Sequence, residues 1–339
     1  MSMPKVQEQQ ENGDKVREIT FGQAIREALV EEMRRDPTIV VMGEDVAAAG
    51  TVFKVFVGVL EEFGSKRVID TPISENGFAG LAIGAAMCGL KPIVEFMSFN
   101  FSFVAADQII SNAAKMYYMS GGRFHVPIVF RGPNGAAAQV SSQHSHCVEA
   151  IYSQLPGLIV VSPSTAYDYK GLLKSAIRNP NPVLFLESEL DYGLKMEIPK
   201  EEFLVEIGKA KVEREGSDLT LVSHGHMMTL CREVVAELEE EVDIELIDLR
   251  TIKPLDIGTV ARSVRKTHFA VLVEEGHLFG GITSEVGFQL QEHCFDDLDA
   301  PLTRVCQKET PMPYSKMLEK ETLPTKERLL RAIRQTLNI

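Results

Sequence analysis

The segment DTPISENGFAG, residues 70–80, joins a short apolar run at Arg67–Ile69 to an Ala- and Gly-rich stretch at Gly77–Gly89. The first pattern predicts a strand, and the second predicts a helix packed close to its neighbours. Ligands of open α/β sheets bind where strands end and such helices begin. Glu75 stands at this junction, so we expect its carboxylate to enter a binding site. A first-turn Glu that only stabilises the helix dipole is an equally good interpretation of the pattern alone.

Strand and helix patterns alternate on both sides of this segment, which predicts an α/β fold of mostly parallel sheets covered by helices. Thr20, with Gln23 three residues later, predicts a capping box at the start of the first helix. The expected strands are Thr38–Met42, Arg67–Ile69, Lys91–Glu95, Val126–Arg131, Leu158–Ser162, Val183–Glu187, Leu219–Ser223, Ile244–Leu249 and Ala270–Glu274. The expected helices include Val104–Met119, Thr165–Arg178, Met227–Leu238, Ile257–Lys266, Thr283–His293 and one after Pro324.

The chain has 339 residues, which is too long for one ordinary core and predicts two domains. A polar stretch from Asp191 to Glu202 separates the two alternating regions. We therefore expect a flexible tail at 1–17, a first domain at 18–192, a linker at 193–210 and a second domain at 211–339. The tail lacks the apolar core of a secretion signal and the Arg-rich bias of a transit peptide, which favours a cytoplasmic protein.

The charge balance argues against nucleic acids and membranes as partners. Asp and Glu number 48 against 35 Lys and Arg, giving a net charge of −13. Such a surface repels a duplex or an anionic bilayer, and no apolar run reaches the ~18 residues of a membrane span. The five cysteines are far apart and form no C-x-x-C pair, which argues against a structural zinc or a redox dithiol.

Two further polar segments are candidates for chemistry. Glu44 follows an expected strand; alone it suggests a polar turn, but together with Glu75 it suggests carboxylates converging at one sheet edge. Residues 141–146 carry His144 and His146 without a recognisable third metal ligand, so one histidine used for proton transfer or hydrogen bonding is favoured over zinc. The Gly-rich segment 276–281 fits no phosphate-loop motif.

Several blocks together resemble the beta subunits of thiamine-diphosphate-dependent 2-oxo acid dehydrogenases. The blocks are residues 70–80, 95–101, 117–122, 130–135 and 143–145, and the likeness extends from about Ile19 to the C-terminus. The resemblance implies a pyrimidine-binding domain followed by a transketolase C-terminal-type domain. Residues 187–193 and 311–314 favour the branch that uses pyruvate over the branched-chain relative.

The resemblance also implies residue roles. Glu75 would hydrogen-bond the aminopyrimidine ring nitrogen of thiamine diphosphate, in a pocket lined by Glu44, Ile73 and Phe101. His144 would face the reacting carbon and assist either reductive acylation of a lipoyl group or binding of the intermediate. A potassium ion held largely by carbonyls would map to Ile128, Ala176, Ile177, Asn179 and Asn181, with Asn179 standing where some relatives carry Asp.

The chain lacks the Gly-Asp-Gly motif with which thiamine enzymes hold magnesium and the diphosphate. The resemblance therefore implies half of a site, completed by an alpha subunit in an α2β2 tetramer. The second domain would dock on the lipoyl-bearing acyltransferase core of a larger complex. Acetoin and branched-chain dehydrogenase subunits, a non-catalytic assembly homologue and a self-sufficient transketolase-like enzyme are the alternatives.

Overall fold

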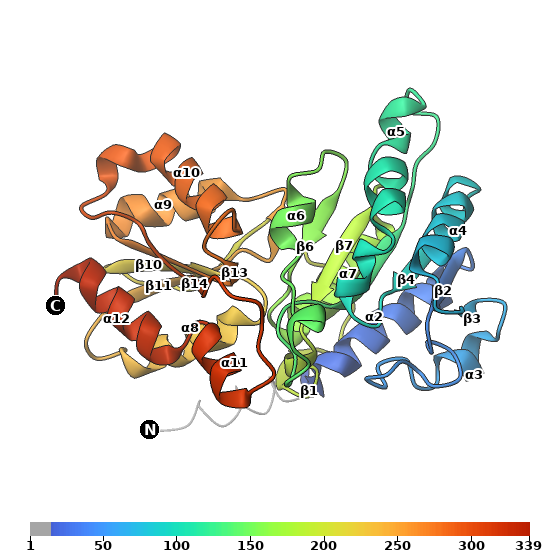
Figure 1. The fold of residues 1–339 in the computed structure, drawn as a ribbon, viewed down its shortest axis with the longest axis horizontal. Coiled ribbons are helices and arrows are strands. Elements are labelled where there is room, and N and C mark those ends of the chain that lie inside the picture. The colour runs from blue at the N-terminus through green and yellow to red at the C-terminus, as the bar shows by residue number, and fades with distance from the viewer. Residues whose placement is uncertain (1–14) are drawn as a thin grey trace, which may run out of the picture.

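Residues 15–339 are described by the computed structural model, in which two α/β lobes lie side by side (Figure 1). The sheet of the first lobe has seven strands in the order β12-β6-β7-β5-β4-β2-β3. These strands are β2 (Ile39–Gly43), β3 (Val68–Asp70), β4 (Lys91–Glu95), β5 (Val129–Pro133), β6 (Ile159–Val161), β7 (Val183–Glu187) and β12 (Thr251–Lys253). All pair in parallel except β12, which comes from the second half of the chain and runs antiparallel to β6.

The second lobe has five strands in the order β14-β13-β10-β11-β9. They are β9 (Lys211–Arg214), β10 (Leu219–Ser223), β11 (Ile244–Asp248), β13 (Ala270–His277) and β14 (Thr303–Gln307). A separate ribbon pairs β1 (Val16–Thr20) with β8 (Lys195–Pro199) in antiparallel fashion. The observed architecture confirms the predicted α/β fold.

Helices cover both lobes. The α-helices are α2 (Phe21–Arg35), α3 (Val59–Phe63), α4 (Glu75–Met87), α5 (Met116–Met119), α6 (Glu149–Ser153), α7 (Ala166–Arg178), α8 (Met227–Glu237), α9 (Ile257–Thr267), α10 (Ile282–Cys294), α11 (Lys316–Thr322) and α12 (Lys326–Leu337). Shorter turns are η1 (Phe99–Phe103), η2 (Gln108–Ala113), η3 (Ser142–His144), η4 (Glu189–Asp191) and η5 (Phe295–Asp297). No helix within residues 15–339 is long and apolar enough to cross a bilayer.

The strands β2, β5 and β7 of the first sheet are buried on both faces, as parallel strands usually are. Because successive side chains alternate, Val40 and Met42 of β2 pack on the face covered by α4, while Ile39 and Val41 pack on the face covered by α2 and α7. The core on the α4 face continues into the second lobe through residues such as Leu249. The two lobes therefore share a hydrophobic cluster.

Sequence signals that depend only on neighbouring residues predict the helix ends better than the interior of a long helix. The predicted capping box is confirmed: Thr20 Oγ1 accepts from the Gln23 backbone, and Gln23 Oε1 accepts from the Thr20 backbone at 2.8 Å. The helix predicted at Val104–Met119 is confirmed only in part, because it is interrupted. Its middle is the π-helix η2, where the Ala114 N–H bonds the Ile109 carbonyl five residues back and shifts the register of the side chains.

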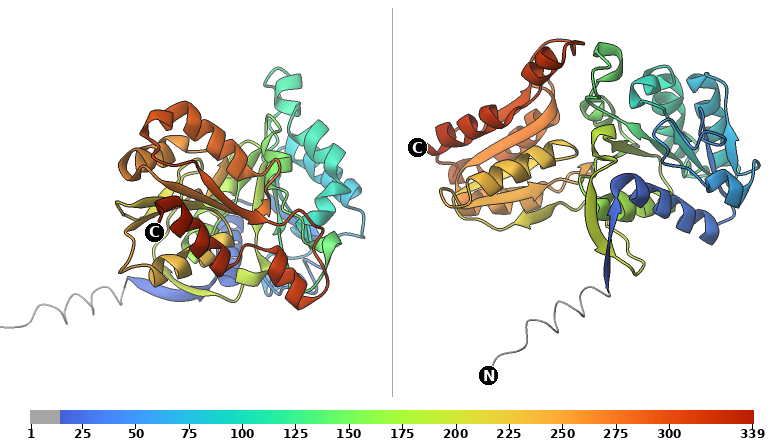
Figure 2. Two further views of the ribbon diagram at one scale, coloured as in Figure 1. Left: turned by 60° about the vertical axis from the view of Figure 1, so that its left-hand side comes forward. Right: turned by 90° about the horizontal axis from the view of Figure 1, so that it is seen from below.

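The predicted tail and the predicted linker each overlap a strand of the structure. Residues 1–14, most of the predicted tail, lie outside the described residues, and β1 starts at Val16. Within the segment predicted as linker, Lys195–Pro199 forms β8 and pairs with β1. Figure 2 shows this ribbon below the two lobes. The bounds themselves stay a prediction.

Candidate functional site

The carboxyl ends of the parallel strands bring the predicted residues to one edge of the first sheet. The chain leaves β2 toward β3 on one side and leaves β4 toward β5 on the other, so the topological switch point lies between β2 and β4. Ligands of open α/β sheets bind at such a point. Glu44 directly follows β2, and Phe101 lies in η1 just after β4. Two residues assigned to the same pocket thus lie at the switch point.

Glu75 and Glu44 form a pair of nearly buried carboxylates. Glu75 is the first residue of α4 and is 7% exposed, and Glu44 is 8% exposed. Burial, followed by the charges of Glu75 and Asp45, raises the pKa of Glu44. Within residues 15–339, Glu44 Oε1 is buried and accepts no hydrogen bond. Buried polar atoms are nearly always paired, so this oxygen fits a hydrogen-bond donor supplied by a ligand.

The strand ends around this pair are fixed to one another. Asp70 at the end of β3 accepts a hydrogen bond from the Ala47 N–H at 2.6 Å, which holds the loop after β2. The Thr71 N–H donates to the Gly43 carbonyl at 2.9 Å. A Cβ on Gly43 would lie 2.6 Å from the Glu95 carbonyl oxygen, so only glycine permits this close approach of β2 and β4. The two carboxylates are therefore presented by a rigid edge.

The structure also brings Phe101 and His144 together. Their ring centroids lie 5.4 Å apart at an interplanar angle of 89°, an edge-to-face contact. Asn100, next to Phe101, accepts at its Oδ1 from the His146 N–H at 2.9 Å, and that oxygen lies 2.6 Å from His146 Nδ1. The histidine segment is therefore attached to η1. The sequence alone indicates no separate role for Asn100, although the residue lies inside a block that carries the resemblance.

A buried ion network lies beneath this edge. Arg131 is 1% exposed and binds Glu95 and Glu187, with Nε 2.5 Å from Glu187 Oε1. The Tyr192 hydroxyl donates to Glu187 at 2.6 Å. Burial raises the pKa of Glu95 to about 7, although the charge of Arg131 opposes this shift. Removal of one member of such a network leaves an uncompensated buried charge, so the network ties together the ends of β4, β5 and β7.

Ile73 differs from the other predicted pocket residues because this chain does not enclose it. It lies two residues before Glu75, and it is 83% exposed. Leu81 on α4 is 64% exposed. Large apolar side chains with this exposure next to buried carboxylates are typical of a surface that another chain covers.

The residues predicted to hold potassium lie at the end of α7 and before β5. The Ile128 carbonyl already accepts from the Val183 N–H at 2.9 Å. The Asn179 side-chain oxygen accepts from the backbone and the side chain of Asn181 at 2.9 and 3.2 Å. Both lone pairs of this amide oxygen are thus occupied, so backbone carbonyls would have to supply the ligands. The potassium site stays a prediction.

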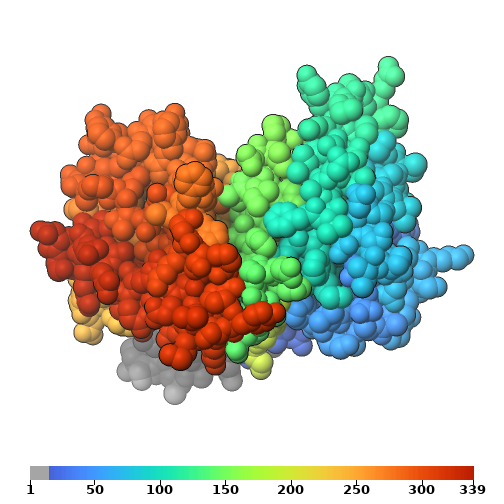
Figure 3. Space-filling view, in the orientation of Figure 1, coloured from blue at the N-terminus to red at the C-terminus, as the bar shows by residue number. Residues whose placement is uncertain are grey.

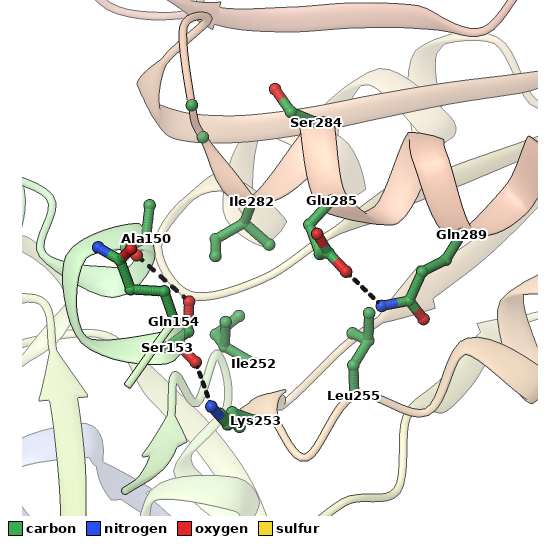
Figure 4. Close-up of a pocket in the computed structure, with 12 residues that line it drawn as sticks. Ala150, Ser153, Gln154, Ile252, Lys253, Leu255, Ile282, Ser284, Glu285 and Gln289 are labelled. Atoms are coloured by element: carbon green, nitrogen blue, oxygen red, sulfur yellow. Dashed lines mark hydrogen bonds between the residues drawn. The ribbon is translucent and has the colours of Figure 1, made fainter. Parts of the chain in front are cut away.

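A groove of about 710 Å³ lies between the lobes, walled by α6, β12 and the start of α10 (Figure 4). Lys253 Nζ spans one side and donates to the carbonyls of Ser153 and Leu155 at 2.6 and 3.1 Å. None of the residues predicted to bind the cofactor lines this groove. It is therefore distinct from the edge that carries Glu44 and Glu75.

An ion pair also joins the lobes. His226, at the start of α8, lies with Nδ1 2.7 Å from the carboxylate of Asp191, which is 1% exposed. Burial lowers the pKa of His226, but the hydrogen bond and charge of Asp191 outweigh burial and raise it to about 8. The charges of Glu275 and Glu233 act in the same direction. The imidazole is therefore protonated in the folded protein at neutral pH.

This pair makes stability depend on pH. The folded pKa of about 8 exceeds the unfolded value of about 6.5, so the stabilisation is complete below pH ~6.5 and is lost as the pH rises through ~8. We compare the free energy of unfolding of wild type with that of His226→Gln. We predict that the advantage of wild type is about 2 kcal/mol larger at pH 6 than at pH 9. Urea unfolding at several pH values measures the difference. The exposed His125→Gln serves as control, and a pH-independent difference for His226→Gln contradicts the assignment.

Comparison with known proteins gives the same order of domains. Residues 17–195 match the family model "Transketolase, pyrimidine binding domain", and residues 208–329 match "Transketolase, C-terminal domain". The chain is 52% identical over 324 residues to the pyruvate dehydrogenase E1 component subunit beta of Rhizobium meliloti (strain 1021), covering 95% of this chain and 70% of the relative. It is 50% identical over 328 residues to the mitochondrial protein of that name from Homo sapiens, covering 95% and 91%.

A solved structure shares the fold. A split-gene transketolase, described as an inactive beta4 tetramer, superposes with a TM-score of 0.77 at 22% identity and covers 94% of this chain and 98% of that chain. At this identity the match supports the fold alone.

Proposed function

The chain belongs to the family of pyruvate dehydrogenase E1 component beta subunits, and on that premise we propose that it is the beta subunit of a thiamine-diphosphate-dependent pyruvate dehydrogenase. Its reaction would be oxidative decarboxylation of pyruvate and reductive acetylation of a lipoyl group on the acyltransferase component. The observation that carries the proposal is the pair Glu44 and Glu75, two nearly buried carboxylates at one edge of the first sheet. Within residues 15–339, Glu44 Oε1 has no hydrogen-bond partner.

Bound thiamine diphosphate would supply a thiazolium carbon that adds to the 2-oxo carbon and a ring that takes up the electrons released by decarboxylation. Glu75 would hold a proton against the pyrimidine ring nitrogen, a role that its near-burial supports because water does not compete for that proton. Glu44 would line the same pocket and accept a hydrogen bond there. Phe101 and His144, in edge-to-face contact, would form the wall nearest the reacting carbon.

The partner completes the site. The sequence contains no Gly-Asp-Gly motif, so we propose that an alpha subunit holds magnesium and the diphosphate in an α2β2 heterotetramer. The exposure of Ile73 beside Glu75 supports such a covering chain. Docking on the acyltransferase core and a potassium ion held by Ile128, Ala176, Ile177, Asn179 and Asn181 belong to the same proposal and rest on the resemblance. A cytoplasmic location is proposed with them.

Acetoin and branched 2-oxo acids are the competing substrates, because the alpha subunit shapes part of the pocket. Co-expression with an alpha-type subunit and assays on pyruvate, acetoin and branched 2-oxo acids test the choice. Highest kcat/KM on pyruvate supports the proposal. Preference for either competitor contradicts it, and absence of all turnover from a correctly assembled tetramer favours a non-catalytic homologue.

Glu75→Gln keeps the shape of the side chain and removes its ionisable carboxyl group. We predict that this variant assembles normally but decarboxylates pyruvate ~10²–10⁴-fold more slowly, the usual range for loss of a general acid or base. Size-exclusion chromatography and a decarboxylation assay with an artificial electron acceptor measure the two properties. Glu61→Gln, an exposed residue on α3, is the matched control. Turnover within threefold of wild type would refute the proton-sharing role.

We predict that His144→Ala slows reductive acetylation of a lipoyl domain by a factor at least ~10 times larger than it slows turnover with an artificial acceptor. The reason is that the imidazole stands at the reacting carbon and transfers a proton in the second half-reaction. Gln143→Ala, exposed in the same turn, is the control. Equal losses in the two assays would instead place His144 in cofactor activation.

A further inference from the structure

The segment that carries His144 is a loop of residues 136–146, called here the histidine loop. It leaves β5 after Pro133 and returns before α6. The Gly135 N–H donates to the His146 carbonyl at 2.9 Å, so the two ends of the loop are joined. Asn100 holds His146 at the returning end. The first lobe therefore fixes where the loop closes, but these contacts leave the residues before His144 unanchored.

The C-terminal lobe supplies three further anchors. The Ala136 N–H donates to the carboxylate of Glu275 at β13, and the Gln139 N–H donates to Glu319 on α11 at 3.0 Å. Ser141 Oγ donates to the Met312 carbonyl at 3.2 Å. Figure 1 shows α11 beside the green loop, and Figure 3 shows the red surface of this segment against the green one. Anchors from one lobe thus hold a loop of the other.

The backbone of the loop needs these anchors. Gln139 and Ser141 are not glycines, yet their φ values are +60° and +67°. A positive φ is unfavourable for residues other than glycine and persists only where the surroundings impose it. Each strained residue is itself bonded to the C-terminal lobe. His144 follows three residues after Ser141, so the path of the backbone into the histidine is set by these contacts.

Glu275 is the more deeply buried of the two carboxylates that anchor the loop. It is 8% exposed, and its carboxylate lies so near the backbone of Gly135 that a Cβ there would be 2.7 Å from Glu275 Oε1. Gly135 has a φ of +79°, which also favours glycine. Burial raises the pKa of Glu275, and the charge of His226 opposes this shift. The carboxylate is therefore a fixed acceptor at the start of the histidine loop.

We propose that Glu275 is a positioning residue for His144: from the C-terminal lobe it anchors the start of the histidine loop and so sets the imidazole against Phe101. This role rests on the proposed function of His144 in acetyl transfer. It also makes the second lobe a part of the catalytic apparatus, since a displacement of β13 relative to the first sheet would move the histidine.

The test uses the assembled tetramer with Glu275→Ala and Glu275→Gln. Hydrogen exchange of the amides of residues 136–146 reports the anchor without any need for turnover. We expect the exchange to rise at least ~10-fold in the alanine variant and less than threefold in the glutamine variant, whose amide oxygen can still accept from Ala136. Glu292→Ala, an exposed glutamate on α10, should leave the exchange unchanged.

The catalytic arm compares acetylation of a lipoyl domain with turnover of an artificial acceptor. Glu275→Ala should lower acetylation of the lipoyl domain ~10-fold and turnover of the artificial acceptor less than threefold. The double variant with His144→Ala should acetylate the lipoyl domain no more slowly than His144→Ala alone, because the two residues act as one unit. Unchanged exchange, or increased exchange with an unchanged ratio of activities, overturns the proposal. A wild-type tetramer without pyruvate turnover overturns the proposed function instead, and the exchange arm still decides whether Glu275 anchors the loop.

Discussion

Two carboxylates held out of water at one sheet edge impose the main constraint on this molecule. Glu44 and Glu75 are each less than a tenth exposed, and the charge of one raises the pKa of the other. Burying a charged or polar group without a partner is costly, yet an oxygen of Glu44 has no partner within residues 15–339. The scaffold tolerates this cost because the strand ends cannot relax: Asp70 holds one loop, and Gly43 lets β2 lie against Glu95.

The rest of the structure supports that edge from below and from the side. Below it, Arg131 compensates two buried glutamates that end neighbouring strands. From the side, the C-terminal lobe contributes strand β12 to the first sheet, an ion pair at His226 and the anchors of the histidine loop. The lobes therefore act as one support for the site, although each has its own sheet. The face of Ile73 remains open, as expected for a subunit whose site is completed by a second chain.

Sequence patterns predicted the elements whose signals are local. The strands β4, β7 and β10 have the predicted bounds, and β2 differs from its predicted bounds by one residue at each end. Strand β12 could not be predicted because three residues carry no periodicity and the strand forms only against β6. The ion network of Arg131 could not be predicted either, because its partners Glu95 and Glu187 lie 36 and 56 positions away. The sequence shows Arg131 only as the last residue of an expected strand. Glu275 is 139 positions from Ala136, so no spacing rule could find it.

The central claim is that this chain holds half of a thiamine diphosphate site. The most direct test is isothermal titration of thiamine diphosphate with magnesium into the purified chain, and then into the chain assembled with an alpha-type subunit. The account predicts no measurable binding to the chain alone and a dissociation constant of order micromolar or tighter for the assembly, a difference of at least ~4 kcal/mol between millimolar and micromolar affinity. Micromolar binding with pyruvate turnover by the chain alone would contradict it.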